Sequence, residues 1–132
     1  MTNNINVKLD TSVTPNALDV QDHGHIHVDK HSKAQTITWN LTGQLNQGAF
    51  VPMTDSPPGF QWIGTAPPAG IFGTPTIGSN GNSLSITDNH GGSGTDGKWT
   101  YQLRVDYQGT IYETIATVPG QDTIKDPVII NR

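Results

Sequence analysis

Hydrophobic and polar residues alternate along several stretches of this chain, and the alternation predicts β-strands. The clearest stretches are residues 5–9, 36–41 and 99–107, in which every second residue is hydrophobic. Successive side chains of a strand point to opposite faces of a sheet, so each stretch should place one face in a core and the other in water. The same reasoning predicts shorter strands at 18–20, 22–29, 49–51, 60–63, 84–86, 110–118 and 124–130.

Turn-forming residues separate these stretches at short intervals. Asn80-Gly81 is a strong hairpin signal, and Gln108-Gly109 predicts that residues 98–118 form one long hairpin. Pro75 lacks a backbone donor, which leaves residues 71–77 as an edge strand or a loop. No stretch is long enough to serve as a linker, so residues 1–132 are expected to form one domain.

The composition favours the same fold class. Thr, Ile and Val, which suit a pleated surface, make up 37 of the 132 residues, whereas strong helix formers are scarce and Glu113 is the single glutamate. Short, regularly spaced strands fit an all-β, antiparallel, immunoglobulin-like sandwich of two sheets with about seven to nine strands. A small antiparallel β-barrel is the alternative.

Charge and cysteine content exclude several classes of function. The chain has no cysteine, which excludes disulfides, thiolate catalysis and Cys-ligated metal centres. A net charge of −4 with only seven Lys and Arg residues argues against binding to nucleic acid or to an anionic membrane. No hydrophobic run approaches the roughly 18–20 residues of a membrane span. The first residues lack a secretory signal pattern, so a cytoplasmic location is expected.

Short segments spread over most of the chain resemble a known family. The order of Ile37-Thr38-Trp39, residues 84–89, residues 98–105 and a closing Asp126-Pro127 before Ile129 and Asn131 is similar to that of the DP-EP family of prokaryotic proteins. The resemblance implies a bacterial protein with a β-sandwich fold. It assigns no catalytic residue.

A histidine-rich segment offers the most specific chemistry. On a strand, His23, His25 and His27 would face the same way, with neighbouring Cβ atoms roughly 6.5–7 Å apart. Two such imidazoles can hold one Zn, Ni or Cu ion, but the first and third would be roughly 13 Å apart, too far to share it. The sequence therefore predicts a histidine pair that needs outside ligands, such as Asp22, Asp29 or His90.

Two other interpretations of the same histidines stay open. They can form a solvated outer face while Ile26 and Val28 fill the core. They can also respond to pH, because protonation of all five histidines of the chain would move its net charge from −4 to +1. Repulsion between like charges on one strand face would then loosen that edge in acid.

The glycine-rich segment from Asp88 to Lys98 resembles a phosphate-binding loop only superficially. Gly92 to Lys98 fits G-x-x-x-x-G-K, but Trp99 follows where Ser or Thr is needed, and a strand pattern follows where a helix is needed. Asp88, Asn89 and Asp96 offer oxygens for Ca²⁺, without the spacing of an EF-hand. A flexible hairpin loop is the favoured interpretation.

An aromatic and proline-rich region supplies the last candidate. Phe60, Trp62 and Phe72 lie on or beside stiff loops, where large apolar side chains suit recognition of a partner or ligand. The alternative is that these rings plug the open end of the core. No G-x-S-x-G motif or paired carboxylate is present, so no catalytic site is predicted.

These observations predict a non-enzymatic binding or interaction module of immunoglobulin-like fold that works without a cofactor. Its partner would be another protein or a second copy of the chain, because the sheets of a sandwich keep open edges. A metal-binding protein that uses the His-x-His-x-His strand is the second hypothesis. The third is a carbohydrate-binding domain in which Phe60 and Trp62 stack on sugar.

Overall fold

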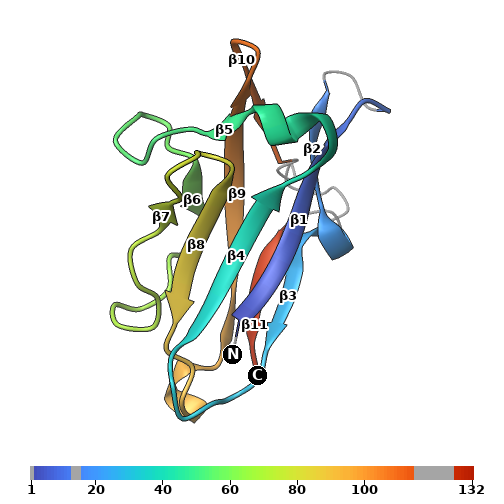
Figure 1. The fold of residues 1–132 in the computed structure, drawn as a ribbon. Helices are drawn as coiled ribbons and strands as arrows, with labels where there is room; N and C mark the ends of the chain where they lie inside the picture. The colour runs from blue at the N-terminus through green and yellow to red at the C-terminus, as the bar shows by residue number, and fades with distance from the viewer. Residues whose placement is uncertain (1, 13–15, 115–126) are drawn as a thin grey trace.

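The computed structural model describes residues 2–12, 16–114 and 127–132, and it folds them into two β-sheets packed face to face (Figure 1). One sheet has five strands in the order β2-β1-β4-β8-β7, and the other has six. The two-sheet sandwich is confirmed, and both sheets are open, so the barrel alternative is wrong. The first sheet consists of β1 (Thr2–Asp10), β2 (Ala17–Val20), β4 (Gln35–Leu41), β7 (Thr76–Ile77) and β8 (Ser83–Asp88).

The second sheet is organised around its longest strand, β9, which pairs with β5, β6, β10 and β11, while β3 pairs with β11. Its strands are β3 (His25–Val28), β5 (Ala49–Phe50), β6 (Phe60–Ile63), β9 (Gly97–Tyr107), β10 (Thr110–Glu113) and β11 (Val128–Asn131). Three short 3-10 turns complete the elements, namely η1 (Gln21–Gly24), η2 (Gly43–Gln47) and η3 (Ser93–Thr95). The described residues contain eleven strands, more than the seven to nine expected, and no α-helix.

The sheets are mixed, which corrects the antiparallel prediction. β1 pairs in parallel with β4, and β11 pairs in parallel with β3. The path of the chain explains the first pair: β2 is antiparallel to β1, the chain then crosses to the other sheet, and β4 returns beside β1 in the same direction. A pattern of alternation predicts strands but contains no information on their direction.

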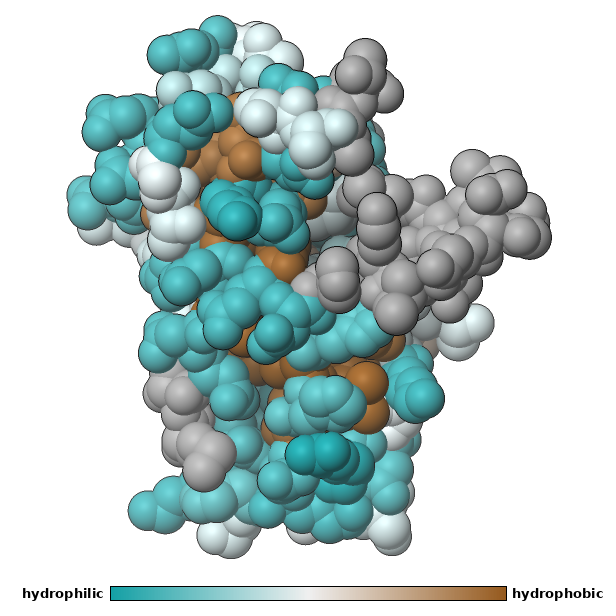
Figure 2. Space-filling model, turned by 90° about the vertical axis from the view of Figure 1, so that its right-hand side faces the viewer, coloured by the Kyte–Doolittle hydropathy of each residue, from teal (hydrophilic) through white to brown (hydrophobic). Residues whose placement is uncertain are grey.

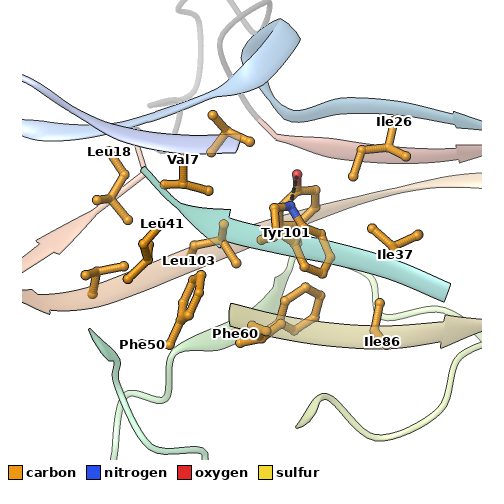
Figure 3. Close-up of a cluster of buried hydrophobic side chains, with 14 of the residues drawn as sticks. Val7, Leu18, Ile26, Ile37, Leu41, Phe50, Phe60, Ile86, Tyr101 and Leu103 are labelled. Atoms are coloured by element: carbon orange, nitrogen blue, oxygen red, sulfur yellow. Dashed lines mark hydrogen bonds between the residues drawn. The ribbon is translucent and has the colours of Figure 1, made fainter. Parts of the chain in front are cut away.

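Alternate residues of both sheets form one hydrophobic core between them. The middle of this core is shown in Figure 3, where Val7 and Ile37 of the first sheet face Tyr101 and Leu103 of the second. Along β4 the predicted alternation is complete, with every second residue buried. The start of β1 and the end of β11 lie at the same end of the sandwich, the lower end in Figure 1.

Aromatic residues join the two sheets at the centre of the core. The indole nitrogen of Trp39 donates a hydrogen bond of 3.1 Å to the Tyr101 hydroxyl, which donates one of 2.9 Å to the Gly24 carbonyl. The ring of Phe60 stacks on that of Tyr101 with centroids 5.6 Å apart. Burial raises the pKa of the Tyr101 hydroxyl, so the hydroxyl stays protonated and keeps its donor role.

The predicted hairpins are present. Gln108 and Gly109 both have positive φ, the geometry that a two-residue hairpin turn requires, and β9 pairs with β10 across them. β7 pairs with β8 around Asn80-Gly81, with Ile77 opposite Leu84. The parts of predicted strands at 115–118 and 124–126 lie outside the described residues.

The histidine-rich segment departs from the predicted strand over 22–29. Residues 21–24 form η1, and the strand begins only at His25. Asp22 and Gly24 have φ of +53° and +75°, and these left-handed conformations turn the chain from the first sheet to the second. A Cβ on Gly24 would meet the Cβ of Pro127 at 2.6 Å, so the site has no space for a side chain. A glycine between two histidines was the available signal of this break.

Candidate functional site

The three histidines do not share one strand face. His25 is half-buried and His27 is exposed, on the outer side of β3, whereas His23 belongs to η1 and its side chain lies outside the described part of the structure. Ile26 and Val28 are buried, as predicted. Among the described residues, no group of three or more His, Cys, Asp or Glu side chains could hold a metal ion. The metal hypothesis therefore gains no further ligand from the structure.

The aromatic side chains predicted to form a recognition loop lie partly in the core and partly at its edge. Phe60 is buried in the central cluster, and Trp62 and Phe72 are half-buried. Ring centroids are 5.0 Å apart for Phe60 and Trp62, 4.9 Å for Trp62 and Phe72, and 5.6 Å for Phe72 and Trp99. Neighbouring rings are tilted or edge-on by 51° to 89°, as in protein cores, and present no flat shared platform. This geometry favours a plug that closes one side of the sandwich.

A buried arginine on β9 was not singled out by the sequence. Arg104 is 7 % exposed and donates from Nη2 to Gln102 and from Nη1 to Gln61, at 2.7 and 2.9 Å. It also donates from Nε to Glu113 at 3.3 Å and from Nη1 to the Pro58 carbonyl at 3.0 Å. The guanidinium thus joins β6, β9 and β10, and its partners are accounted for by this structural network.

The glycine-rich segment is a crossover between the sheets, because β8 belongs to the first sheet and β9 to the second. This corrects the expected hairpin loop. The segment and the end of β11 enclose a polar cluster, here called the end layer, at the lower end of the sandwich in Figure 1. The end layer consists of Asp88, His90, Thr95 and Asn131.

Asp88 and Asn131 bring the two sheets together in the end layer. Both side chains point inward from their strands, and they are 0 % and 3 % exposed. The amide nitrogen of Asn131 donates to Asp88 Oδ1 at 3.1 Å and to the Thr95 carbonyl at 3.0 Å. Asp88 Oδ2 and Asn131 Oδ1 are buried without a hydrogen-bond partner. Two orphaned acceptors in one contact are unusual, because buried polar atoms are nearly always paired.

His90 closes the end layer against the glycine-rich segment. Its side chain is 0 % exposed, with Nδ1 2.7 Å from the Thr95 hydroxyl and Nε2 2.9 Å from the Arg132 carbonyl. The Thr95 hydroxyl lies 2.8 Å from the Gly92 carbonyl, to which it donates. A carbonyl can only accept, so Nε2 is the donor of the hydrogen bond to Arg132.

Charged side chains surround the end layer at its solvent side. Asp96 Oδ1 lies 3.6 Å from His90 Nε2 and 2.9 Å from Lys30 Nζ. Arg132 forms an exposed ion pair of 2.9 Å with Asp29. Burial raises the pKa of Asp88 above its ordinary value, whereas the Asn131 hydrogen bond and the nearby His90 lower it by smaller amounts.

The outer face of the five-stranded sheet carries a second polar arrangement, here called the polar outer face. Its side chains are hydroxyls and amides without a formal charge. They come from four neighbouring strands: Asn4 and Asn6 on β1, Thr36, Thr38 and Asn40 on β4, Ser83, Ser85 and Thr87 on β8, and Thr76 on β7. Asn4, Thr38, Ser85 and Thr76 form one continuous row across the sheet.

Few of these groups use their full hydrogen-bonding capacity on one another. The Thr38 and Ser85 hydroxyls are 2.9 Å apart, and the Asn40 amide donates to Asn4 at 3.5 Å. A hydroxyl offers one donor and two acceptor positions, and a primary amide offers two of each. Most of the donor and acceptor positions on this face are therefore directed outward. The period of two along each strand explains this face, because the intervening residues fill the core.

A hollow of about 550 Å³ adjoins the polar outer face beside β1 and β2. Asn6 lies on the polar outer face and also lines the hollow. Lys8 and Asp19 line the hollow as well, and their side chains form an ion pair of 3.7 Å. The other lining residues are Val20, Gln21, Asp22 and Thr42. Figure 2 shows the side of the molecule on the right of Figure 1 as mostly hydrophilic, with hydrophobic atoms visible in gaps between polar ones.

Comparison with models of known protein families gives no match, and no curated protein matches the chain. The described residues contain no helix that is long and hydrophobic enough to cross a membrane.

Proposed function

We propose that this protein is a non-enzymatic binding module of immunoglobulin-like type, and that its polar outer face recognises a neutral, hydroxyl-rich ligand such as an uncharged carbohydrate. The observation that carries the proposal is the composition of that face. Nine hydroxyl and amide side chains on four neighbouring strands lie together without a formal charge among them. This choice moves the carbohydrate hypothesis from the aromatic loop, where Phe60 is buried, to the first sheet.

The chemistry of the face matches a sugar better than other ligands. Sugar hydroxyls donate and accept hydrogen bonds, and so do the hydroxyls and amides of Thr38, Asn40 and Ser85. An ionic ligand would leave its charge without a partner on this surface, which disfavours it. Strands about 4.8 Å apart with same-face residues roughly 6.5–7 Å apart form a regular grid, which suits a repeating chain. The adjoining hollow has room for a substituent or a chain end.

The experiment is a screen of the full chain against immobilised neutral and charged glycans, followed by titration of the best ligand. The double variant Thr38→Val with Ser85→Ala removes two adjacent hydroxyls and keeps the side-chain volumes close to the originals. Loss of two hydrogen bonds, each worth about 0.5–1.5 kcal/mol, should weaken binding by about tenfold. Thr110→Val, at an exposed position of β10 in the other sheet, is the matched control and should leave the affinity unchanged.

Three results would contradict the proposal. One is the absence of any neutral glycan ligand, and another is a ligand set limited to charged glycans. The third is equal weakening by the double variant and by Thr110→Val, because the binding surface would then lie elsewhere.

A further inference from the structure

The end layer lacks hydrogen-bond donors for two of its oxygens. Asp88 Oδ2 and Asn131 Oδ1 have no partner, although Asn131 Nδ2 already binds Asp88 Oδ1. Exchanging the amide oxygen and nitrogen of Asn131 cannot resolve this, because Nδ2 also donates to the Thr95 carbonyl. Both oxygens therefore lack a donor, and each belongs to a side chain of the Asp88–Asn131 contact.

A single proton on Asp88 supplies this donor. Protonated Oδ2 can donate to Asn131 Oδ1 while Asn131 Nδ2 donates back to Oδ1, which gives a closed acid–amide pair. His90 lies beside this pair, with Nε2 2.9 Å from the Arg132 carbonyl and Nδ1 2.7 Å from the Thr95 hydroxyl.

We propose that the end layer is a proton-binding site that takes up one proton on Asp88 Oδ2, and that the contact between Asp88 and Asn131 is complete only when this proton is bound. Without the proton, a carboxylate oxygen and an amide oxygen stay buried and unpaired.

Burial of Asp88 favours its neutral form. Desolvation is the largest influence on Asp88 and raises its pKa, whereas the Asn131 hydrogen bond and His90 lower it by smaller amounts. Two ion pairs lie beside the layer, namely Asp96 with Lys30 and Asp29 with Arg132, both at 2.9 Å.

The position of the site gives the proton a structural effect. Asp88 ends β8 in the first sheet and Asn131 ends β11 in the second, so their contact holds the two sheets together at one end. Loss of the proton should weaken this contact and release the Thr95 carbonyl that Asn131 binds. The end layer would therefore hold the two sheets together more tightly as the pH falls through the pKa of Asp88.

The main test is Asp88→Asn in the full chain, because an asparagine presents the same donor and acceptor as the protonated acid. We expect this variant to raise the Tm at about pH 7.5 by about 2–5 °C. Asp96→Asn is the matched control, since it removes an exposed carboxylate near the same imidazole and should not raise the Tm. A fall in the Tm of Asp88→Asn would overturn the proposal, because it would show an ionised Asp88 held by His90.

A spectroscopic measurement tests the protonation state of Asp88 directly. In infrared spectra recorded through a pH titration of the unmodified chain, one protonated carboxyl stretch should persist to higher pH than those of ordinary aspartates. This band should be absent from Asp88→Asn. A spectrum in which all carboxyl bands disappear together at the pH of ordinary aspartates would overturn the proposal.

Discussion

At the scale of single residues, a small number of buried polar atoms link the two sheets through the hydrophobic core. The Tyr101 hydroxyl accepts a hydrogen bond from Trp39 and donates one to the Gly24 carbonyl. It thereby links β9 of one sheet to β4 of the other and to the turn before β3. Removing one partner of a buried hydrogen bond destabilises a protein by more than the net free energy of that bond. The remaining donor or acceptor stays buried without water or a partner.

Tyr101→Phe should therefore destabilise the protein although it keeps the ring and its stacking on Phe60. The Trp39 N–H and the Gly24 carbonyl would be left unpaired inside the core, and we expect a loss of about 1–3 kcal/mol in the free energy of unfolding. Urea denaturation measures it. Tyr112→Phe, at a half-buried position of β10, is the matched control and should cost less than about 1 kcal/mol. Equal losses would show that the central hydroxyl is not specifically needed.

At the scale of elements, alternation was sufficient to predict most strands and their inward faces. Trp39, Tyr101 and Leu84 are buried as their spacing requires, because one face of each strand must fill a core. The parallel pairs could not be predicted, since direction depends on the path of the chain between sheets.

The candidate sites were harder to predict than the strands, because they depend on turns and on contacts between distant residues. The break at Gly24, which separates His23 from His25 and His27, follows from a left-handed conformation and the close approach of Pro127. Asp88 and Asn131 stand 43 positions apart, so sequence spacing gave no indication of their contact. The strand β8 predicts only that residue 88 would face inward, where an aspartate is unexpected.

Strand β11 offers a direct test of the face assignment. Ile129 is 0 % exposed and belongs to the core, whereas its neighbour Ile130 is half-buried on the outer side. Ile129→Ala should cost about 2–5 kcal/mol, because it removes buried methyl groups and leaves a cavity. Ile130→Ala makes the same chemical change and should cost about 1 kcal/mol or less. Comparable losses in chemical denaturation would contradict the orientation of this strand.

At the scale of the whole molecule, the sandwich distributes its polar groups unevenly. The uncharged polar outer face lies on one sheet beside the Lys8–Asp19 ion pair, the arginine network lies on the other sheet, and the end layer closes one end of the core. The charged pairs on the surface, such as Lys8 with Asp19, are well exposed and should contribute less than about 1 kcal/mol each. Asp88 differs from these pairs because its side chain is buried and burial raises its pKa.

The direction of that response follows from the raised pKa of Asp88. A carboxyl whose pKa is higher in the folded than in the unfolded state binds more protons when folded, so its stabilising contribution is lost as the pH rises through the folded pKa. The contribution of Asp88 to the free energy of unfolding should increase as the pH falls through its folded pKa, with a slope of at most about 1.4 kcal/mol per pH unit for one proton. Subtracting the profile of Asp88→Asn gives the contribution of Asp88 together with its interaction with His90. Relative to the variant, the unmodified protein should gain stability on acidification and then reach a plateau below the ordinary pKa of an aspartate. A difference that moves the other way would mean that Asp88 is ionised in the folded protein and stabilised by its neighbours.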